Sequence, residues 1–274
     1  MGGVVVVRLR RIASGYGLLE GPRVDAQGNL HFADVTNGGV YRRAADGSVT
    51  TVVAKRRGVG GIALHADGGL VISGRDVCHV RDGTTRILFE RPDGVGGFND
   101  LFTDAEGRVY AGALRSNPFG EDAGRSAGEL YRIEGENMAV ELYGDVRLSN
   151  GIGFSPDGRI LYHSDTAAGH IIAHDVAEDG AVSGRRVFTR VAPGAPDGLA
   201  VDEAGAVWVA CYGGGCVARY APGGRLDRRL EVPARRVASL CFGGSDRRDL
   251  YVVTADSTDD ANLAGSILAT RVEV

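Results

Sequence analysis

The sequence predicts an all-β protein, a six-bladed β-propeller, from its glycine content, a repeated strand–turn–strand motif and the absence of helical periodicity. Glycine supplies 43 of the 274 residues and proline only 8, and glycine spread evenly along a chain indicates many tight turns. Apolar residues alternate as in strands, and no useful length of the chain shows the 3.6-residue period of a helix. We therefore expect residues 1–274 to form a single propeller domain.

The repeated motif consists of an apolar run, a turn rich in Asp and Gly, and a second apolar run. Two such runs around an Asp/Gly turn predict a β-hairpin. The copies lie about 40–50 residues apart, which is the spacing of a four-stranded propeller blade. Five are clear and the sixth is degenerate: GPRVDAQGNLHFAD (21–34), GGIALHADGGLVIS (60–73), NDLFTDAEGRVYAG (99–112), NGIGFSPDGRILYHSD (150–165), DGLAVDEAGAVWVAC (197–211) and ASLCFGGSDRRDLYVVTA (238–255).

The two ends of the chain predict how the ring closes. Each of the first five copies is followed by two further strand-like runs, but only SILATRVEV (266–274) follows the sixth. The missing outer strand of the last blade has a candidate in VVVVRLRRIAS (4–14) near the N-terminus. We expect this N-terminal strand to pair with the last blade, which leaves no free sheet edge there.

Composition excludes several classes of function. The net charge is −4 and the arginines are interleaved with acidic residues, which argues against nucleic acid as a partner. No stretch reaches transmembrane length, and MGGVVVVRLRR (1–11) lacks the pattern of a signal peptide. We therefore expect a cytoplasmic protein that is a monomer or a weak homo-oligomer, with neither nucleic acid nor a membrane as partner.

The cysteines do not predict a metal site. Their spacing matches no metal-binding pattern, so we interpret them as small buried apolar residues. Two of them flank a tight turn, and a disulfide between these two is the less favoured alternative. The four are Cys78, Cys211, Cys216 and Cys241.

The repeat also locates a candidate site. Eight residues before the hairpin glycine, four copies carry Glu20, Asn99, Asn150 and Asp197. The equivalent positions of the other two copies hold small residues, Gly60 and, near the degenerate turn, Ser239. Because equivalent positions of a propeller face equivalent directions, these side chains are expected to converge at one rim of the central channel.

The chemistry of this set indicates a cation. Two carboxylates and two amides brought together at a channel mouth would be costly without one, because carboxylates repel and lose hydration. An all-oxygen set suits Ca²⁺, Mg²⁺ or Mn²⁺. The alternative is that each residue caps its own blade through turn hydrogen bonds.

Several of these motifs resemble the SMP-30/gluconolactonase/luciferin-regenerating-enzyme (regucalcin-like) family over essentially the whole chain. The resemblance implies that Glu20, Asn150 and Asp197 bind one divalent ion, with Ca²⁺ the first choice and Mg²⁺, Mn²⁺ or Zn²⁺ as alternatives. It also implies that Asn99 holds a water or the substrate and that Asp197 doubles as the general base or water-orienting group. The motifs are LLEGPRVDAQGNLHFAD (18–34), FNDLFTDAEGRVYAG (98–112), LSNGIGFSPDGRILYHSDT (148–166) and PDGLAVDEAGAVWVA (196–210).

The implied activity is gluconolactonase-like: a metal-dependent carboxylic-ester hydrolase in which the ion polarises a lactone carbonyl and activates water. Family members acting on sugar lactones carry an arginine where this chain has Gly97, and an acidic residue near Asn117. Asp100, Arg115 and Asn117 are the further candidates for substrate contact. Two alternatives remain open: a specialised enzyme of secondary metabolism acting on a less polar lactone or ester at the same site, and a non-catalytic metal-binding scaffold.

Overall fold

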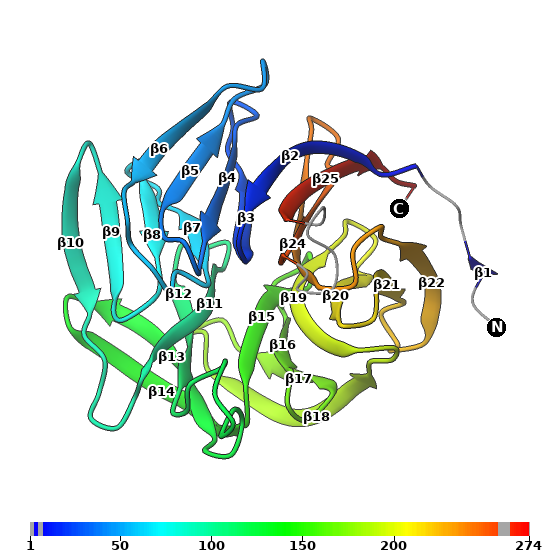
Figure 1. Cartoon of the computed structure of the whole chain (residues 1–274). Coiled ribbons are helices and arrows are strands. Elements are labelled where there is room, and N and C mark those ends of the chain that lie inside the picture. Colours follow the sequence, from blue (N-terminus) through cyan, green and yellow to red (C-terminus); the bar gives the residue numbers. More distant parts are fainter. Residues whose placement is uncertain (1–2, 5–7, 257–263, 274) are drawn as a thin grey trace.

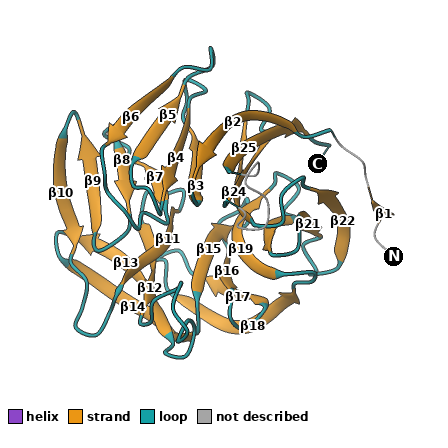
Figure 2. Cartoon of the chain, viewed as in Figure 1, coloured by secondary structure: helices purple, strands orange, loops and turns teal. Residues whose placement is uncertain are grey.

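Strands arranged in six sheets form the regular structure of the described part of this protein. The computed structural model describes residues 3–4, 8–256 and 264–273. Over these residues the chain contains strands joined by turns and loops, without helix (Figure 2). The six sheets surround a centre (Figure 1), which confirms the predicted six-bladed β-propeller. No helix in the described residues is long and apolar enough to span a membrane.

Each blade is an antiparallel sheet whose strands follow one another outward from the centre. Blades 1 to 3 contain β3 (Leu19–Val24), β4 (Leu30–Asp34), β5 (Val40–Arg43) and β6 (Val49–Val53); β7 (Ile62–Leu64), β8 (Leu70–Ile72), β9 (Val77–Arg81) and β10 (Thr84–Phe89); and β11 (Gly97–Thr103), β12 (Val109–Leu114), β13 (Gly128–Gly135) and β14 (Met138–Val146). Blades 4 to 6 contain β15 (Ser149–Phe154), β16 (Ile160–Asp165), β17 (His170–Val176) and β18 (Val182–Arg190); β19 (Ala195–Val201), β20 (Val207–Tyr212), β21 (Cys216–Tyr220) and β22 (Leu226–Glu231); and β23 (Val237–Gly243), β24 (Asp249–Thr254), β25 (Gly265–Arg271) and β2 (Arg10–Tyr16).

The ring closes by the predicted exchange of a strand between the two ends of the chain. The N-terminal β2 pairs with β25 in antiparallel register, with Arg10 opposite Ala269. It thereby forms the outer strand of blade 6, as expected. The start of the predicted strand behaves differently, because β1 (Gly3–Val4) pairs in parallel with β22 at the outer edge of blade 5. The valines at 5–7 lie outside the described residues.

The core is distributed between neighbouring blades. Between blades 5 and 6, the fully buried Trp208 belongs to one apolar cluster with Leu240 and Leu268. Between blades 6 and 1, Phe32 and Ile267 share another. Because both faces of most sheets are covered in this way, the second strands of the blades are almost wholly buried, and those of blades 2 and 5 are almost wholly apolar.

The structure confirms the interpretation of the cysteines as small buried residues. All four are free and buried. Cys211 and Cys216 lie directly opposite each other on β20 and β21, as the short turn between them suggests, and they remain thiols.

Candidate functional site

The four polar residues selected by the repeat all lie at irregularities near the start of an innermost strand. The register of the inner strand shifts at each of them: after Glu20 on β3, and across Asn99 on β11, Asn150 on β15 and Asp197 on β19. A β-bulge bends its strand locally and re-aims the side chains there. The same bend therefore recurs in four blades.

Small residues next to these positions let neighbouring inner strands approach closely. A Cβ atom on Gly151 would lie 2.4 Å from the backbone nitrogen of Leu199 in the next blade. At Gly60, a Cβ atom would lie 2.1 Å from Asn99 Oδ1. The amide of Asn99 thus occupies the space that the missing side chain of blade 2 leaves open, and glycine is required at both positions for steric reasons.

All four residues line one cavity of about 740 Å³: Glu20, Asn99, Asn150 and Asp197. Two other sequence-selected residues, Arg115 and Asn117, line it as well. Because these side chains come from blades 1, 3, 4 and 5, the structure brings together residues far apart along the chain. Asp100 is the one candidate that does not line this cavity.

Two of the carboxylates that line the cavity are buried, and their few hydrogen bonds compensate this burial only in part. Glu20 is 6% exposed and Asp197 is 4% exposed. Burial raises the pKa of Glu20 well above its usual value, and the negative charges of Asp197 and Asp100 raise it further. Burial and the charge of Asp100 likewise raise the pKa of Asp197, whose Oδ1 atom is buried without a hydrogen-bond partner. A positive ligand would relieve both the repulsion and the unmet hydrogen bond.

The orientation of Asn150 is determined by a short chain of hydrogen bonds. The Thr166 hydroxyl donates to the carbonyl oxygen of Pro196 at 2.7 Å, so its oxygen is left to accept from Asn150 Nδ2 at 3.2 Å. Because the amide nitrogen is used in this way, Asn150 Oδ1 is available as an acceptor in the cavity. Asn99 is oriented similarly, since its Nδ2 donates to the carbonyl of Ser149 at 2.8 Å.

These donor atoms fit a hard divalent cation. Glu20 and Asp197 offer carboxylate oxygens and Asn150 offers an amide oxygen, which are the ligand types that Ca²⁺ and Mg²⁺ prefer. Among the described residues no group of three or more His, Cys, Asp or Glu side chains is placed to hold a metal. Glu20 and Asp197 supply only two such side chains, and the third member of the set, Asn150, is an amide.

Three of the expected substrate contacts already make hydrogen bonds within the protein. Arg115 Nε donates to Glu129 Oε1 at 2.6 Å. Asn117 Oδ1 accepts from the backbone of Phe119 at 3.0 Å and so shapes its own loop. Asp100 accepts from the backbone of Leu101 at 2.8 Å. Its carboxylate therefore acts on the cavity through its charge.

Arg75 is a cavity residue that sequence reasoning missed. It lines the cavity, is exposed, and has no hydrogen bond or ion pair with any described residue. A Cβ atom on Gly97 would lie 2.7 Å from the carbonyl oxygen of Gly74 and 3.7 Å from Arg75 Cα. No side chain fits at position 97, and Arg75 enters the cavity beside it from blade 2. It lies outside the repeated motif, so no sequence signal marked it.

Thr166 is the second missed residue. It ends the motif that contains Asn150, sixteen residues further along the chain. The only sequence signal for Thr166 is its position directly after Asp165, the last residue of β16. Its two hydrogen bonds, however, reach into different blades and follow from the tertiary structure alone.

Comparison with known proteins supports the resemblance seen in the sequence. The family model described as SMP-30/gluconolactonase/LRE-like region matches residues 18–256. A 6-deoxy-6-sulfogluconolactonase of Pseudomonas putida is 35% identical over 260 residues, covering 89% of this chain and 87% of that protein. A pentonolactonase of Haloferax volcanii is 32% identical over 239 residues, covering 85% and 79%.

A solved structure has the same fold. The crystal structure of a calcium-binding protein, regucalcin, from Agrobacterium tumefaciens superimposes with a TM-score of 0.87 over 100% of this chain and 97% of that chain. At 23% identity this likeness concerns the fold alone. The family match and the relatives above 30% identity are decisive for ancestry: the chain belongs to the SMP-30/gluconolactonase/LRE-like family.

Proposed function

We propose that this protein is a lactonase that depends on a divalent cation held by Glu20, Asn150 and Asp197. The observation that carries the proposal is the pair of buried carboxylates in one cavity, one of them with an unpartnered oxygen. Relatives named as lactonases, 35% and 32% identical over most of this chain, support the reaction class. Calcium is the first choice of ion because all three ligand groups present oxygen.

The residues of the cavity have distinct tasks in the proposed hydrolysis. A bound divalent cation would supply positive charge for the lactone carbonyl oxygen and acidify a water. Asp197 Oδ1, which lacks a donor, accepts a hydrogen bond from the attacking water and orients it. Asn99 holds the substrate or a second water beside it. The water oxygen bonds to the carbonyl carbon, the ring C–O bond breaks, and the ring oxygen leaves as a protonated hydroxyl, so that the product is a hydroxy acid.

Arg75 supports a substrate with polar or acidic groups. Its guanidinium lines the cavity and has no partner among the described residues, and such a group binds hydroxyls and anionic oxygens well. Leu114, Phe119 and Tyr212 supply apolar surface on other sides. We therefore propose a sugar-acid lactone, recognised by Arg75 instead of by a side chain at the sterically closed position 97. The less polar lactone or ester remains the alternative because of the apolar walls.

The test is a proton-release assay with glucono-δ-lactone, γ-butyrolactone and dihydrocoumarin. We expect hydrolysis that EDTA abolishes and that added Ca²⁺, Mg²⁺ or Mn²⁺ restores. Glu20→Gln should lose activity, whereas Glu203→Gln, which changes an exposed acid beside the turn of blade 5, should not. Activity that survives complete removal of metal would contradict the proposal.

A second comparison tests the role of Arg75. The Arg75→Gln variant should raise KM for glucono-δ-lactone by about tenfold, as expected for a lost charge-assisted hydrogen bond. It should leave the hydrolysis of dihydrocoumarin, which has no hydroxyl for the guanidinium to bind, almost unchanged. Preference of the wild-type protein for dihydrocoumarin would favour the alternative substrate class.

A further inference from the structure

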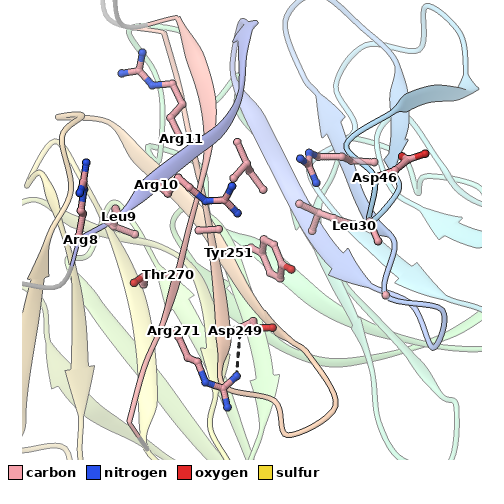
Figure 3. Close-up of a pocket in the computed structure, with 15 residues that line it drawn as sticks. Arg8, Leu9, Arg10, Arg11, Leu30, Asp46, Asp249, Tyr251, Thr270 and Arg271 are labelled. Atoms are coloured by element: carbon pink, nitrogen blue, oxygen red, sulfur yellow. Dashed lines mark hydrogen bonds and ion pairs between the residues drawn. The ribbon is translucent and has the colours of Figure 1, made fainter.

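A second large cavity, distant from the candidate site, lies between blades 6 and 1. This groove has a volume of about 1120 Å³ and is lined by residues of β2, β24 and β25 on one side and of blade 1 on the other (Figure 3). The hairpin glycine Gly28 lines the groove, whereas Glu20 of the candidate site lies at the start of β3, the strand that leads to this hairpin. The two cavities are therefore at opposite ends of blade 1.

The groove carries a concentration of positive charge. Five arginines and two aspartates line it, although the protein has a net charge of −4. Both aspartates are engaged: Asp249 pairs with Arg271 at 3.1 Å, the dashed line of Figure 3, and Asp46 accepts from the backbone and the hydroxyl of Ser48. The remaining arginines have no carboxylate partner within the described part of the chain: Arg8, Arg10, Arg11 and Arg43.

Two of these arginines approach one tyrosine from different blades. The guanidinium of Arg10, from β2, extends toward the ring of Tyr251 on β24 (Figure 3). Arg43, from β5 of blade 1, donates through Nη1 to the carbonyl of Ala44 at 3.3 Å, while its Nε atom is buried without a partner. Burial and the negative charge of Asp249 raise the pKa of Tyr251, whereas the charges of Arg43 and Arg10 lower it. The phenol therefore lies within the field of both cations.

We propose that this groove is a binding site for a small anion that carries a phosphate group. Arg10 and Arg43 supply guanidinium donors from two walls of the groove. The Tyr251 hydroxyl, which donates to no described residue, supplies a third hydrogen-bond donor. A tetrahedral anion has enough oxygens to accept from all three groups, and arginine matches phosphate oxygens in pairs. Arg8 and Arg11 add positive potential at the rim, which attracts an anion to the groove.

Calorimetric titration with inorganic phosphate and with glycerol 3-phosphate at low ionic strength tests the proposal. We expect one saturable site per chain for both compounds. Tighter binding of the ester would indicate that the ligand is an organic phosphate, and equal binding would indicate free phosphate. Arg43→Gln and Arg10→Gln should each weaken binding by at least about tenfold, because each removes charge-assisted hydrogen bonds.

Two control variants separate this site from other sources of binding. Arg42→Gln removes the same charge from the neighbouring exposed residue of β5, which does not line the groove, and should leave the affinity unchanged. Glu20→Gln should also bind phosphate normally, since phosphate bound through a cation at the candidate site would be lost with that ligand. Melting temperatures of all variants without phosphate check that each is folded.

Three results would overturn the proposal. The first is that neither compound shows saturable binding at concentrations up to about 10 mM, which is tenfold above the millimolar dissociation constants of weak ligands. The second is equal affinity in Arg43→Gln, Arg10→Gln and Arg42→Gln. The third is saturable binding of duplex DNA without binding of the small phosphates, which would assign the positive surface to a different class of partner.

Discussion

Two buried aspartates on one strand have opposite surroundings. Asp197 near the start of β19 is 4% exposed and Asp202 just after its end is 3% exposed. The Asp202 carboxylate accepts from the backbone of Ala206 at 2.9 Å, from Trp208 Nε1 at 2.8 Å and from Arg219 Nε at 2.9 Å. Asp197, in contrast, has an oxygen without a partner and a raised pKa.

The difference separates a structural carboxylate, Asp202, from Asp197, for which we propose a function. A buried charge with a full set of donors and a cation partner ties its surroundings together, and removing it leaves the partner uncompensated. A buried carboxylate with an unpartnered oxygen and no cation beside it lowers stability, and such groups cluster at sites where a ligand or a reaction uses them. Burial alone does not distinguish Asp197 from Asp202; the count of donors does.

The largest expected effect is that of Asp197→Asn on catalysis. Because this variant removes a cation ligand and the oxygen that orients water, lactone hydrolysis should fall by at least about 1,000-fold, or about 4 kcal/mol in activation free energy. In EDTA, its free energy of unfolding should equal or exceed that of the wild type, since an unpaired charge is gone. Steady-state kinetics and urea unfolding measure the two quantities. If Asp197→Asn markedly lowered the free energy of unfolding in EDTA, Asp197 would stabilise the fold as Asp202 does, and the difference between them would not hold.

The reverse result is expected for Asp202→Asn. This variant leaves Arg219 with a weaker partner and should lower the free energy of unfolding by about 3 kcal/mol. Hydrolysis by the folded variant at low temperature should stay within a few-fold of the wild type, because Asp202 does not line the candidate site. Urea unfolding beside Glu203→Gln as the neighbouring control provides the measurement. Unchanged stability would show that the donors around Asp202 contribute little.

Metal binding should compensate the unpaired carboxylates. Calcium at about 100 times its dissociation constant should raise the free energy of unfolding by about 2.7 kcal/mol. Glu20→Gln should lose most of this gain, while Asp202→Asn should keep it despite its lower starting stability. Thermal unfolding with EDTA and with increasing Ca²⁺ tests both. Equal stabilisation of Glu20→Gln and the wild type would place the ion elsewhere.

The effect that is smallest near neutral pH, and that grows as the pH falls, concerns two buried histidines, His163 and His174. His163 bonds to Ser149 Oγ at 2.7 Å and to the Tyr143 hydroxyl at 2.8 Å, and burial lowers its pKa to about 3. Burial also lowers the pKa of His174 to about 4. The unfolded chain therefore binds more protons below pH 6.5, so stability should fall as the pH falls from 6.5 toward 4, by about 1.4 kcal/mol per pH unit for each histidine.

NMR of the imidazole nitrogens, together with urea unfolding at pH 7.5, 6 and 5, measures this effect. Both histidines should remain uncharged at pH 5. Titration of His163 near pH 6.5 would contradict the assignment of a neutral, fully hydrogen-bonded ring. That result would mean that His163, like Asp197, is a buried group whose hydrogen-bonding atoms are not all paired.

The repeat made most of the fold predictable, together with the grouping of four polar residues in one cavity. One hairpin motif in six copies predicted the blades, and a constant offset within it selected Glu20, Asn99, Asn150 and Asp197, which the structure brings to one cavity. This works because rotational pseudosymmetry converts equal positions in the repeat into equal positions around the channel. The expectation that Asp100 would face the same cavity shows the limit, since adjacent residues of a strand point to different sides.

The sequence by itself thus determined the architecture, the closure of the ring through β2 and the meeting of four polar side chains in one cavity, because all of these repeat or follow from pairing of strands. Only the tertiary structure decided which other side chains share a space. Arg75 lines the cavity beside position 97, which the Gly74 carbonyl closes to side chains, and Arg10 and Arg43 line one groove because ring closure sets the last blade against the first. Such contacts between blades depend on packing across long sequence separations, which no local pattern encodes.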